Sequence, residues 1–410
     1  MFRTSLHGKS AKLASFLVFA LGAMLTQLAQ AQTFTVIHDF TGGADGGYPY
    51  SGLTMDRAGN LYGTTSTGGL RNGPGTVFKM ANRNGAWTFA PLYDAGGFAG
   101  VTIGSDGTLY VAGSIGAYGS IFNLRPPARF PPNLLAPWTA TVLYSFQGGS
   151  DGSLPFSAVS FDRAGNIYGT TYYGGNHDNG TVFELSPSDG GWTKSTLYAF
   201  SGIDGSQPYG GVIVDDAGNI YGTTIFGGNY PLCPYNQQGC GTVFQLTPAG
   251  GGRWTEGFLY SFHGAADGAT PYASPIFGPT GNVYGADPGG YDFSDSTVFE
   301  LIPTGEPPTF SLPYDFGYGG VSCGPRAPLG MDAAGNFYGT TYCLGADGNG
   351  SVFKLTPVNG GWTATTLHSF TGNDGYFPYS NVVVDANGNL YGTTQQGGAY
   401  NYGVVWEITP

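Results

Sequence analysis

Short runs of apolar residues recur along the chain, with β-branched or aromatic side chains at many alternate positions. Gly, Asn, Asp or Pro bounds each run, which is the pattern of short strands joined by tight turns. After residue 31 the sequence shows no sustained apolar period of 3.6 residues, so no amphipathic helix is expected there. The pattern predicts an all-β fold.

A seven-residue motif organises these runs into repeats. Gly59–Thr65 reads Gly-Asn-Leu-Tyr-Gly-Thr-Thr, returns in four further copies, and has two degenerate copies. The central tyrosines mark seven units spaced 48 to 63 residues apart: Tyr62, Tyr110, Tyr168, Tyr221, Tyr284, Tyr338 and Tyr391. Repeats of this length indicate a chain built by stacking one supersecondary unit.

Each unit contains four strand-like runs. In the third unit we expect strands at 157–162, 167–172, 181–185 and 192–200, joined as an antiparallel meander. Seven such units predict a seven-bladed β-propeller of four-stranded antiparallel blades. In that fold, the loops after the second strand and after the fourth strand share one face, which we call the loop face.

The two ends of the chain complement each other. Residues 33–40 resemble the fourth strand of a unit, for example 366–370, whereas the chain stops after a third strand at 403–408. We therefore expect the N-terminal strand to complete the last blade and close the ring. An open solenoid would have no use for such complementary ends.

The repeated motifs also resemble a known family. The run Gly59–Thr65, a following Gly-Gly and then Gly75–Phe78 (Gly-Thr-Val-Phe) are similar to the GloVer-type tandem repeat of exported bacterial proteins. The resemblance implies an extracellular location and carries no established activity. Many members of that family carry a C-terminal surface anchor, and we expect none here.

The first 31 residues read as a secretory signal peptide. Arg3, Lys9 and Lys12 precede an apolar run at Leu13–Leu25, and a small-x-small site ends at Ala31. The run is too short for a membrane span. Cleavage after Ala31 would leave residues 32–410 as one propeller domain, which we expect to be a monomer in the periplasm or outside the cell.

Charge limits the choice of partners. The chain has 26 acidic and 14 basic residues and a net charge of −12, so phosphate backbones and anionic membranes would repel it. We expect no nucleic-acid partner. Only 10% of residues are charged, which argues against a coiled coil or a charged disordered tract.

Four cysteines lie in the exported part: Cys233, Cys240, Cys323 and Cys343. In an oxidising compartment an even number predicts disulfides. We expect Cys233 to pair with Cys240 and Cys323 with Cys343, because each pair then closes a short segment within one repeat. Free buried thiols are the alternative, and the spacing does not suit zinc.

Five units carry Asp-Gly-x-x-Pro between the fourth strand and the next first strand. On the loop face these carboxylates would form an acidic funnel for cations or polyhydroxylated ligands, or each would simply cap its own turn. One carboxylate per turn is too few for calcium. The five residues are Asp45, Asp151, Asp204, Asp267 and Asp374.

Aromatic residues accumulate in the irregular loops of the same face. Exposed, they would be stacking platforms for sugar rings or peptide; buried, they would fill gaps between blades. The candidates for ligand binding are Tyr172, Tyr173, Tyr230, Tyr235 and Tyr291.

Residues for catalysis are few. The fifth unit replaces Thr-Thr with Ala286-Asp287, and Asp287, Asp292 and Asp295 are weak candidates for a glycosidase acid and base. His177 is the one loop-face histidine, and no nucleophile elbow or metal-ligand spacing supports it. We expect no cofactor and favour a non-catalytic protein.

The sequence thus favours an exported scaffold that binds a glycan, peptide or protein through its loop face. The alternatives are a carbohydrate-active hydrolase or lyase and a structural envelope protein.

Overall fold

The computed structural model describes residues 32–70, 73–113, 115–127, 138–228, 233, 238–264, 266–290, 295–304, 307–317 and 323–410. Gln32–Pro410 forms one compact unit. Within the described residues, the regular structure is β except for one 3₁₀ turn, η1, at Gly149–Asp151. The described residues contain no helix with the length and apolarity that a membrane span needs.

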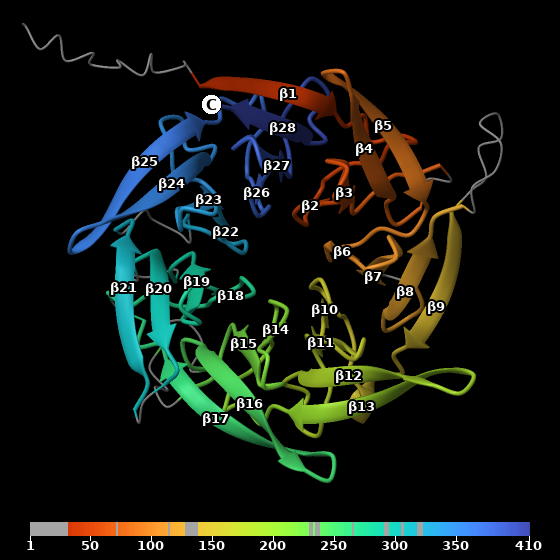
Figure 1. Cartoon of the computed structure of the whole chain (residues 1–410), viewed down its shortest axis with the longest axis vertical. Helices are drawn as coiled ribbons and strands as arrows, with labels where there is room; N and C mark the ends of the chain where they lie inside the picture. The colour runs from red at the N-terminus through yellow and green to blue at the C-terminus, as the bar shows by residue number, and fades with distance from the viewer. Residues whose placement is uncertain are drawn as a thin grey trace, which may run out of the picture. The chain divides into compact units, whose positions relative to one another are not determined.

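Seven four-stranded antiparallel sheets form the predicted propeller ring, and the first strand of each blade lies nearest the centre (Figure 1). Blades one to three contain β2 (Thr54–Met55), β3 (Leu61–Thr64), β4 (Val77–Arg83) and β5 (Ala86–Tyr93); β6 (Val101–Ile103), β7 (Leu109–Gly113), β8 (Ser120–Arg125) and β9 (Thr139–Ser145); and β10 (Ser160–Phe161), β11 (Ile167–Thr171), β12 (Thr181–Ser188) and β13 (Gly191–Ala199).

The remaining blades follow the same order. Blades four to seven contain β14 (Ile213–Val214), β15 (Ile220–Thr224), β16 (Thr242–Gly250) and β17 (Arg253–Ser261); β18 (Ile276–Phe277), β19 (Val283–Asp287), β20 (Thr297–Ile302) and β21 (Thr309–Asp315); β22 (Gly330–Met331), β23 (Phe337–Thr341), β24 (Ser351–Val358) and β25 (Gly361–Ser369); and β26 (Val383–Val384), β27 (Leu390–Thr394), β28 (Val404–Thr409) and β1 (Thr33–Asp39).

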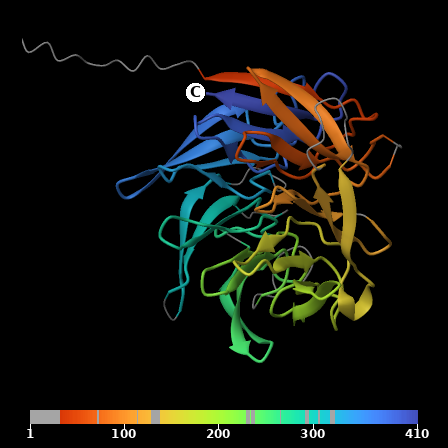
Figure 2. The same cartoon turned by 45° about the vertical axis from the view of Figure 1, so that its right-hand side comes forward.

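The N-terminal strand closes the ring, as predicted. β1 pairs antiparallel with β28, from Thr33 opposite Thr409 to Asp39 opposite Val404, and so completes the seventh blade. The two strands lie side by side in both views of the molecule (Figures 1 and 2). The first and last strands of the chain therefore belong to one sheet.

The innermost strands are shorter than the sequence predicts. We expected a strand at 157–162, but only Ser160 and Phe161 pair with β11. The residue before them faces the neighbouring blade, because the Val159 carbonyl accepts a hydrogen bond from Thr102 Oγ1 at 2.6 Å. Near the axis, contacts between blades thus replace part of the ladder within a blade.

The glycine of the Tyr-Gly-Thr-Thr motif makes room for an aromatic side chain across the strand pair. Gly169 lies opposite Phe183, and a Cβ on Gly169 would stand 2.7 Å from the Phe183 ring. Phe183 is fully buried. The same pairing joins Gly222 to Phe244 and Gly339 to Phe353, which explains why the two motifs recur together.

An aromatic pair lies at every junction between blades. A ring at or just after the end of one blade's outermost strand packs against the buried aromatic ring of the next blade's third strand, with centroids 4.9–6.2 Å apart. The pairs are Phe40–Phe78, Tyr93–Phe122, Phe146–Phe183, Phe200–Phe244, Phe262–Phe299, Phe316–Phe353 and Phe370–Trp406.

The Asp-x-x-Gly-Asn turn is held by its own carboxylate. Asp162 accepts backbone N–H groups from Ala164 and Asn166 through Oδ1, and the Asn166 amide and Tyr168 hydroxyl through Oδ2. Burial raises the pKa of Asp162, but these hydrogen bonds outweigh burial and leave the pKa below its usual value. The recurring Asp is therefore a structural residue, as turn chemistry predicts.

The two threonines of the motif bond in different directions. The first reaches the next blade, since Thr170 Oγ1 donates to the Gly210 carbonyl at 2.9 Å. The second holds its own loop: Thr171 Oγ1 donates to the Tyr173 carbonyl at 2.9 Å and lies 2.7 Å from Thr181 Oγ1. The glycine of Asp-Gly lies against this second threonine.

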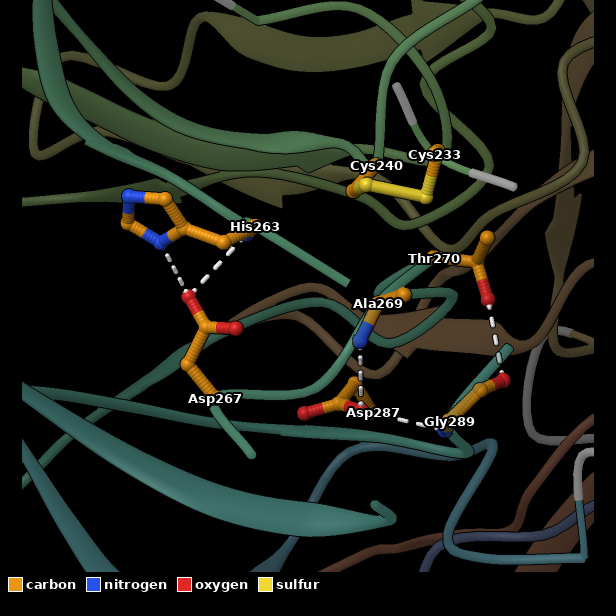
Figure 3. Close-up of a disulfide and its surroundings, with 8 residues drawn as sticks. All are labelled: Cys233, Cys240, His263, Asp267, Ala269, Thr270, Asp287 and Gly289. Atoms are coloured by element: carbon orange, nitrogen blue, oxygen red, sulfur yellow. Dashed lines mark hydrogen bonds and ion pairs between the residues drawn. A yellow bond between two sulfur atoms is a disulfide. The ribbon is translucent and has the colours of Figure 1, made fainter. Parts of the chain in front are cut away.

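Asp287 occupies the position of the second threonine in the fifth blade, and its carboxyl is fully buried. Its Oδ1 accepts the N–H groups of Ala269 and Gly289 at 3.1 and 3.0 Å (Figure 3), and its Oδ2 accepts the Thr297 hydroxyl at 2.5 Å. Burial raises the pKa of Asp287 to about 8, although these hydrogen bonds act in the opposite direction.

Removing the closing strand tests the ring. Deletion of residues 33–40 from a chain that comprises residues 32–410 should lower the free energy of unfolding by several kcal/mol, because β28 loses its partner and Phe78 loses Phe40. The single change Phe40→Ala should cost about 3–5 kcal/mol. Denaturant unfolding measures both variants against Thr35→Ala, an exposed control on β1. A deletion variant with an unaltered melting curve would contradict closure.

Asp287→Thr tests the buried carboxyl. The unfolded chain loses this proton near the usual pKa of 3.8, whereas the folded chain keeps it until about pH 8, so Asp287 makes the protein less stable as pH rises between those values. The variant removes this dependence and restores the motif. Its free energy of unfolding should therefore fall less than that of the wild type between pH 5 and pH 8. Equal decreases in both proteins would refute the assignment.

Candidate functional site

Each loop between a fourth strand and the next first strand brings one large side chain to the axis of the propeller. In five loops the residue directly follows the proline of Asp-Gly-x-x-Pro, and Phe98 and Arg326 take the equivalent place in the second and sixth blades. We call these seven residues the channel ring: Tyr50, Phe98, Phe156, Tyr209, Tyr272, Arg326 and Tyr379.

The channel ring is a continuous circle of contacts. Ring centroids are 5.0 Å apart for Tyr50 and Phe98, 5.5 Å for Phe98 and Phe156, 5.3 Å for Phe156 and Tyr209, 5.4 Å for Tyr209 and Tyr272, and 4.5 Å for Tyr379 and Tyr50. The Arg326 guanidinium completes the circle, 5.7 Å from the centroid of Tyr272 and 5.1 Å from that of Tyr379.

These residues line a cavity of about 250 Å³ that we call the channel cavity. All seven blades contribute to its wall, so the cavity lies on the ring axis. Between the aromatic side chains the wall offers hydroxyl and amide groups, from Ser51, Ser157, Ser274 and Asn381. Phe98 and Phe156 also line a second cavity of about 160 Å³.

Two tyrosines of the channel ring, Tyr50 and Tyr209, keep their protons. Burial raises the pKa of Tyr50 far above its usual value, and the neighbouring Tyr379 adds to the shift. The pKa of Tyr209 also rises, mainly by burial. At neutral pH these hydroxyls are therefore neutral groups that donate and accept hydrogen bonds.

Arg326 is held from several sides. Its guanidinium lies over the Tyr342 ring at 4.0 Å, and Nη1 donates to the Tyr379 hydroxyl. The disulfide between Cys323 and Cys343 joins the loop of Arg326 to the loop of Tyr342. The other predicted pair, Cys233 with Cys240, is also disulfide-bonded, so both predicted pairings are confirmed.

The predicted loop aromatics divide into two groups. Tyr172 packs against the channel ring, with its ring centroid 5.3 Å from that of Phe156. Tyr173 packs edge-on against Tyr172 and is 37% exposed. Tyr230, Tyr235 and Tyr291 lie outside the described residues, so their role stays a prediction.

The five loop aspartates hold their own turns. Each accepts a backbone N–H three or four residues earlier or a group from the outermost strand, and none lines the channel cavity. Their strand partners are His38 for Asp45 at 3.3 Å, Tyr144 for Asp151 at 2.8 Å, Tyr198 for Asp204 at 2.6 Å, Tyr260 for Asp267 at 2.8 Å and His368 for Asp374 at 2.9 Å. Asp267 also lies 2.6 Å from His263, just after β17 (Figure 3). A ligand-binding role for them stays a prediction.

None of the described weak catalytic candidates lines the channel cavity. Asp287 is buried away from the channel cavity, His177 is exposed in the loop after β11, and Asp292 lies outside the described residues. Burial raises the pKa of Asp295, and the nearby charge of Asp315 adds to that shift. Among the described residues, no group of three or more His, Cys, Asp and Glu side chains could hold a metal ion.

Sequence reasoning missed most of the channel ring. The signal was present, because an aromatic residue follows the proline in all five Asp-Gly-x-x-Pro copies. We assigned the predicted binding role to the aspartate of that motif, whereas the aromatic residue is the member that reaches the axis.

Two solved structures of bacterial proteins illustrate the similar fold. PorZ, an essential surface component of the type-IX secretion system of Porphyromonas gingivalis, is 15% identical with a TM-score of 0.53, and the match covers 92% of this chain and 48% of PorZ. The extracellular domain of a putative one-component system from B. thetaiotaomicron is 10% identical with a TM-score of 0.54, over 92% of this chain and 40% of that one. This chain thus spans less than half of either structure, and identities this low show the fold alone.

The sequence comparisons identify the family. No curated protein matches the chain. Residues 98–232 and 233–410 match the Gloeobacter/Verrucomicrobia repeat, and these two matches span more than half of the chain. They agree with the repeat motifs and with the seven blades, and the chain therefore belongs to the Gloeobacter/Verrucomicrobia repeat family.

Proposed function

We propose that this protein is an exported binding module that holds the end of a glycan in the channel cavity at its loop face. The observation that carries the proposal is the channel ring, in which six aromatic side chains and one arginine surround a cavity on the propeller axis. Aromatic faces pack against the apolar faces of sugar rings, while tyrosine, serine and asparagine groups bond their hydroxyls.

The size of the channel cavity favours a terminal sugar over a folded partner. Its volume of about 250 Å³ is just below the roughly 300–1,000 Å³ of small-molecule pockets, and it is too small for a helix or a strand pair. One sugar residue at the end of a chain suits that space. The rest of the glycan would then cross the loop face.

The loop face has apolar side chains that suit such an extended contact. Six of the ten large hydrophobic side chains that are exposed in the described residues belong to its loops: Leu70, Phe98, Tyr118, Tyr173, Ile203 and Tyr400. Exposed apolar groups gathered on one face are typical of interaction surfaces.

Export is part of the proposal. Disulfides persist in oxidising compartments, and the chain has two. The residues proposed for a hydrolase or lyase are less well suited to their task, because a fully buried Asp287 does not reach the channel cavity. We therefore favour binding over turnover.

Substitutions in the channel ring test the proposal. Phe98→Ala and Tyr209→Ala should each weaken the best ligand from a glycan array at least tenfold, or ~1.4 kcal/mol, because each removes a stacking surface. Phe98 is 40% exposed, so its loss should leave the melting temperature nearly unchanged. Calorimetric titration measures the affinities.

Phe258→Ala is the matched control, since Phe258 is exposed on the outermost strand β17 and should bind like the wild type. Retention of glycan affinity in both channel-ring variants would contradict the proposed site. Binding on a peptide array with none on the glycan array would favour the peptide or protein alternative.

A further inference from the structure

Arg326 is the one charged residue among the described residues that line the channel cavity. The wall otherwise consists of aromatic, aliphatic, hydroxyl and amide groups, and it includes no carboxylate from the described part of the chain. This positive charge lies in a protein whose net charge is −12. A cation at the centre of an acidic protein calls for a ligand-based explanation.

The fold does not require an arginine at this position. The other six blades place Tyr or Phe there, and aromatic contacts already join these six side chains in one arc from Tyr379 to Tyr272. Departure from a repeat at a position where the repeat already packs well indicates a local requirement of the site.

The arginine also determines which ligands the aromatic ring can accept. Aromatic faces attract cations, and the guanidinium already lies over Tyr342 at 4.0 Å. The guanidinium would repel a second cation in the same cavity, such as a quaternary ammonium group. The channel cavity is therefore suited to neutral or anionic groups.

One disulfide and one backbone hydrogen bond hold the loop of Arg326 in place. The Cys323–Cys343 disulfide ties its loop to the loop after β23, and the Tyr342 N–H donates to the Gly324 carbonyl at 3.1 Å. In the third and fourth blades the corresponding loops form the backbone bridges Ser153 with Tyr173 and Ser206 with Phe226, and no disulfide joins them. The additional disulfide in the sixth blade restricts the loop that carries Arg326.

We infer that the ligand of the channel cavity is a glycan whose terminal residue bears a carboxylate, and that Arg326 is the residue that selects it. A guanidinium presents planar N–H donors that match a carboxylate. The acidic surface disfavours a polyanion, so the ligand has one carboxylate at an otherwise neutral end. This inference rests on the proposed function, because it assigns a ligand class to the same cavity.

Matched saccharides test the inference. Oligosaccharides that end in glucuronic acid and the same oligosaccharides that end in glucose are titrated into the wild type by calorimetry. The wild type should bind the acidic member at least tenfold more tightly. In Arg326→Gln the ratio of the two affinities should fall to about one, and in Arg326→Lys it should be intermediate, because lysine keeps the charge without the planar donors.

A measurement on the wild type alone guards against a folding defect in the variants. Raising the salt concentration from 50 to 500 mM should weaken the acidic saccharide more than the neutral one. Arg253→Gln is the charge-matched control, because Arg253 is exposed at the start of β17, on the outermost strand of its blade. Its affinity ratio should equal that of the wild type.

The outcomes separate the two hypotheses. Equal affinity of the wild type for acidic and neutral saccharides, with weaker binding of both in Phe98→Ala, would overturn the role of Arg326 and leave the proposed function intact. An absence of binding to any saccharide of either kind would overturn both.

Discussion

The propeller depends on one aromatic contact that is repeated at each junction between blades. A four-stranded sheet exposes two faces, and a small sheet of this kind cannot bury them by itself. The ring at the end of each outermost strand packs against the buried ring of the next blade's third strand, as in Phe200 with Phe244 at 5.2 Å. Phe40 with Phe78 makes the same contact across the join between the chain's first strand and its first complete blade. Closure thus uses the contact that every other junction uses.

The sequence motifs follow from this contact. A large third-strand aromatic needs space on the neighbouring second strand, and Gly169 provides that space opposite Phe183. The first threonine after the glycine then bonds the next blade, and the second bonds its own loop. Asp287 fits the second position because Thr297 and two backbone N–H groups donate hydrogen bonds to its oxygens. Burial raises its pKa to about 8, so the carboxyl keeps its proton up to about that pH.

The same geometry creates the site. A ring of seven equivalent blades brings seven equivalent loop positions to one axis, so residues about 50 positions apart in sequence become neighbours. Six of them are aromatic, and the seventh, Arg326, is held by a disulfide and by the Tyr342 ring. Because the repeat requires only a bulky side chain at this position, one blade can have a charged residue there in place of an aromatic one.

Sequence alone determined the features that depend on local pattern. Strand alternation, the recurring Tyr-Gly-Thr-Thr and the spare strand at residues 33–40 predicted the blades and their closure, and short spacing predicted both disulfides. Only the tertiary structure decided which loop residues face the axis. Asp204 remains beside the outermost strand and accepts the Tyr198 hydroxyl, whereas five residues later Tyr209 has reached the channel cavity. An extended chain advances about 3.3 Å per residue, so a few positions in sequence separate the rim of a blade from the centre of the ring.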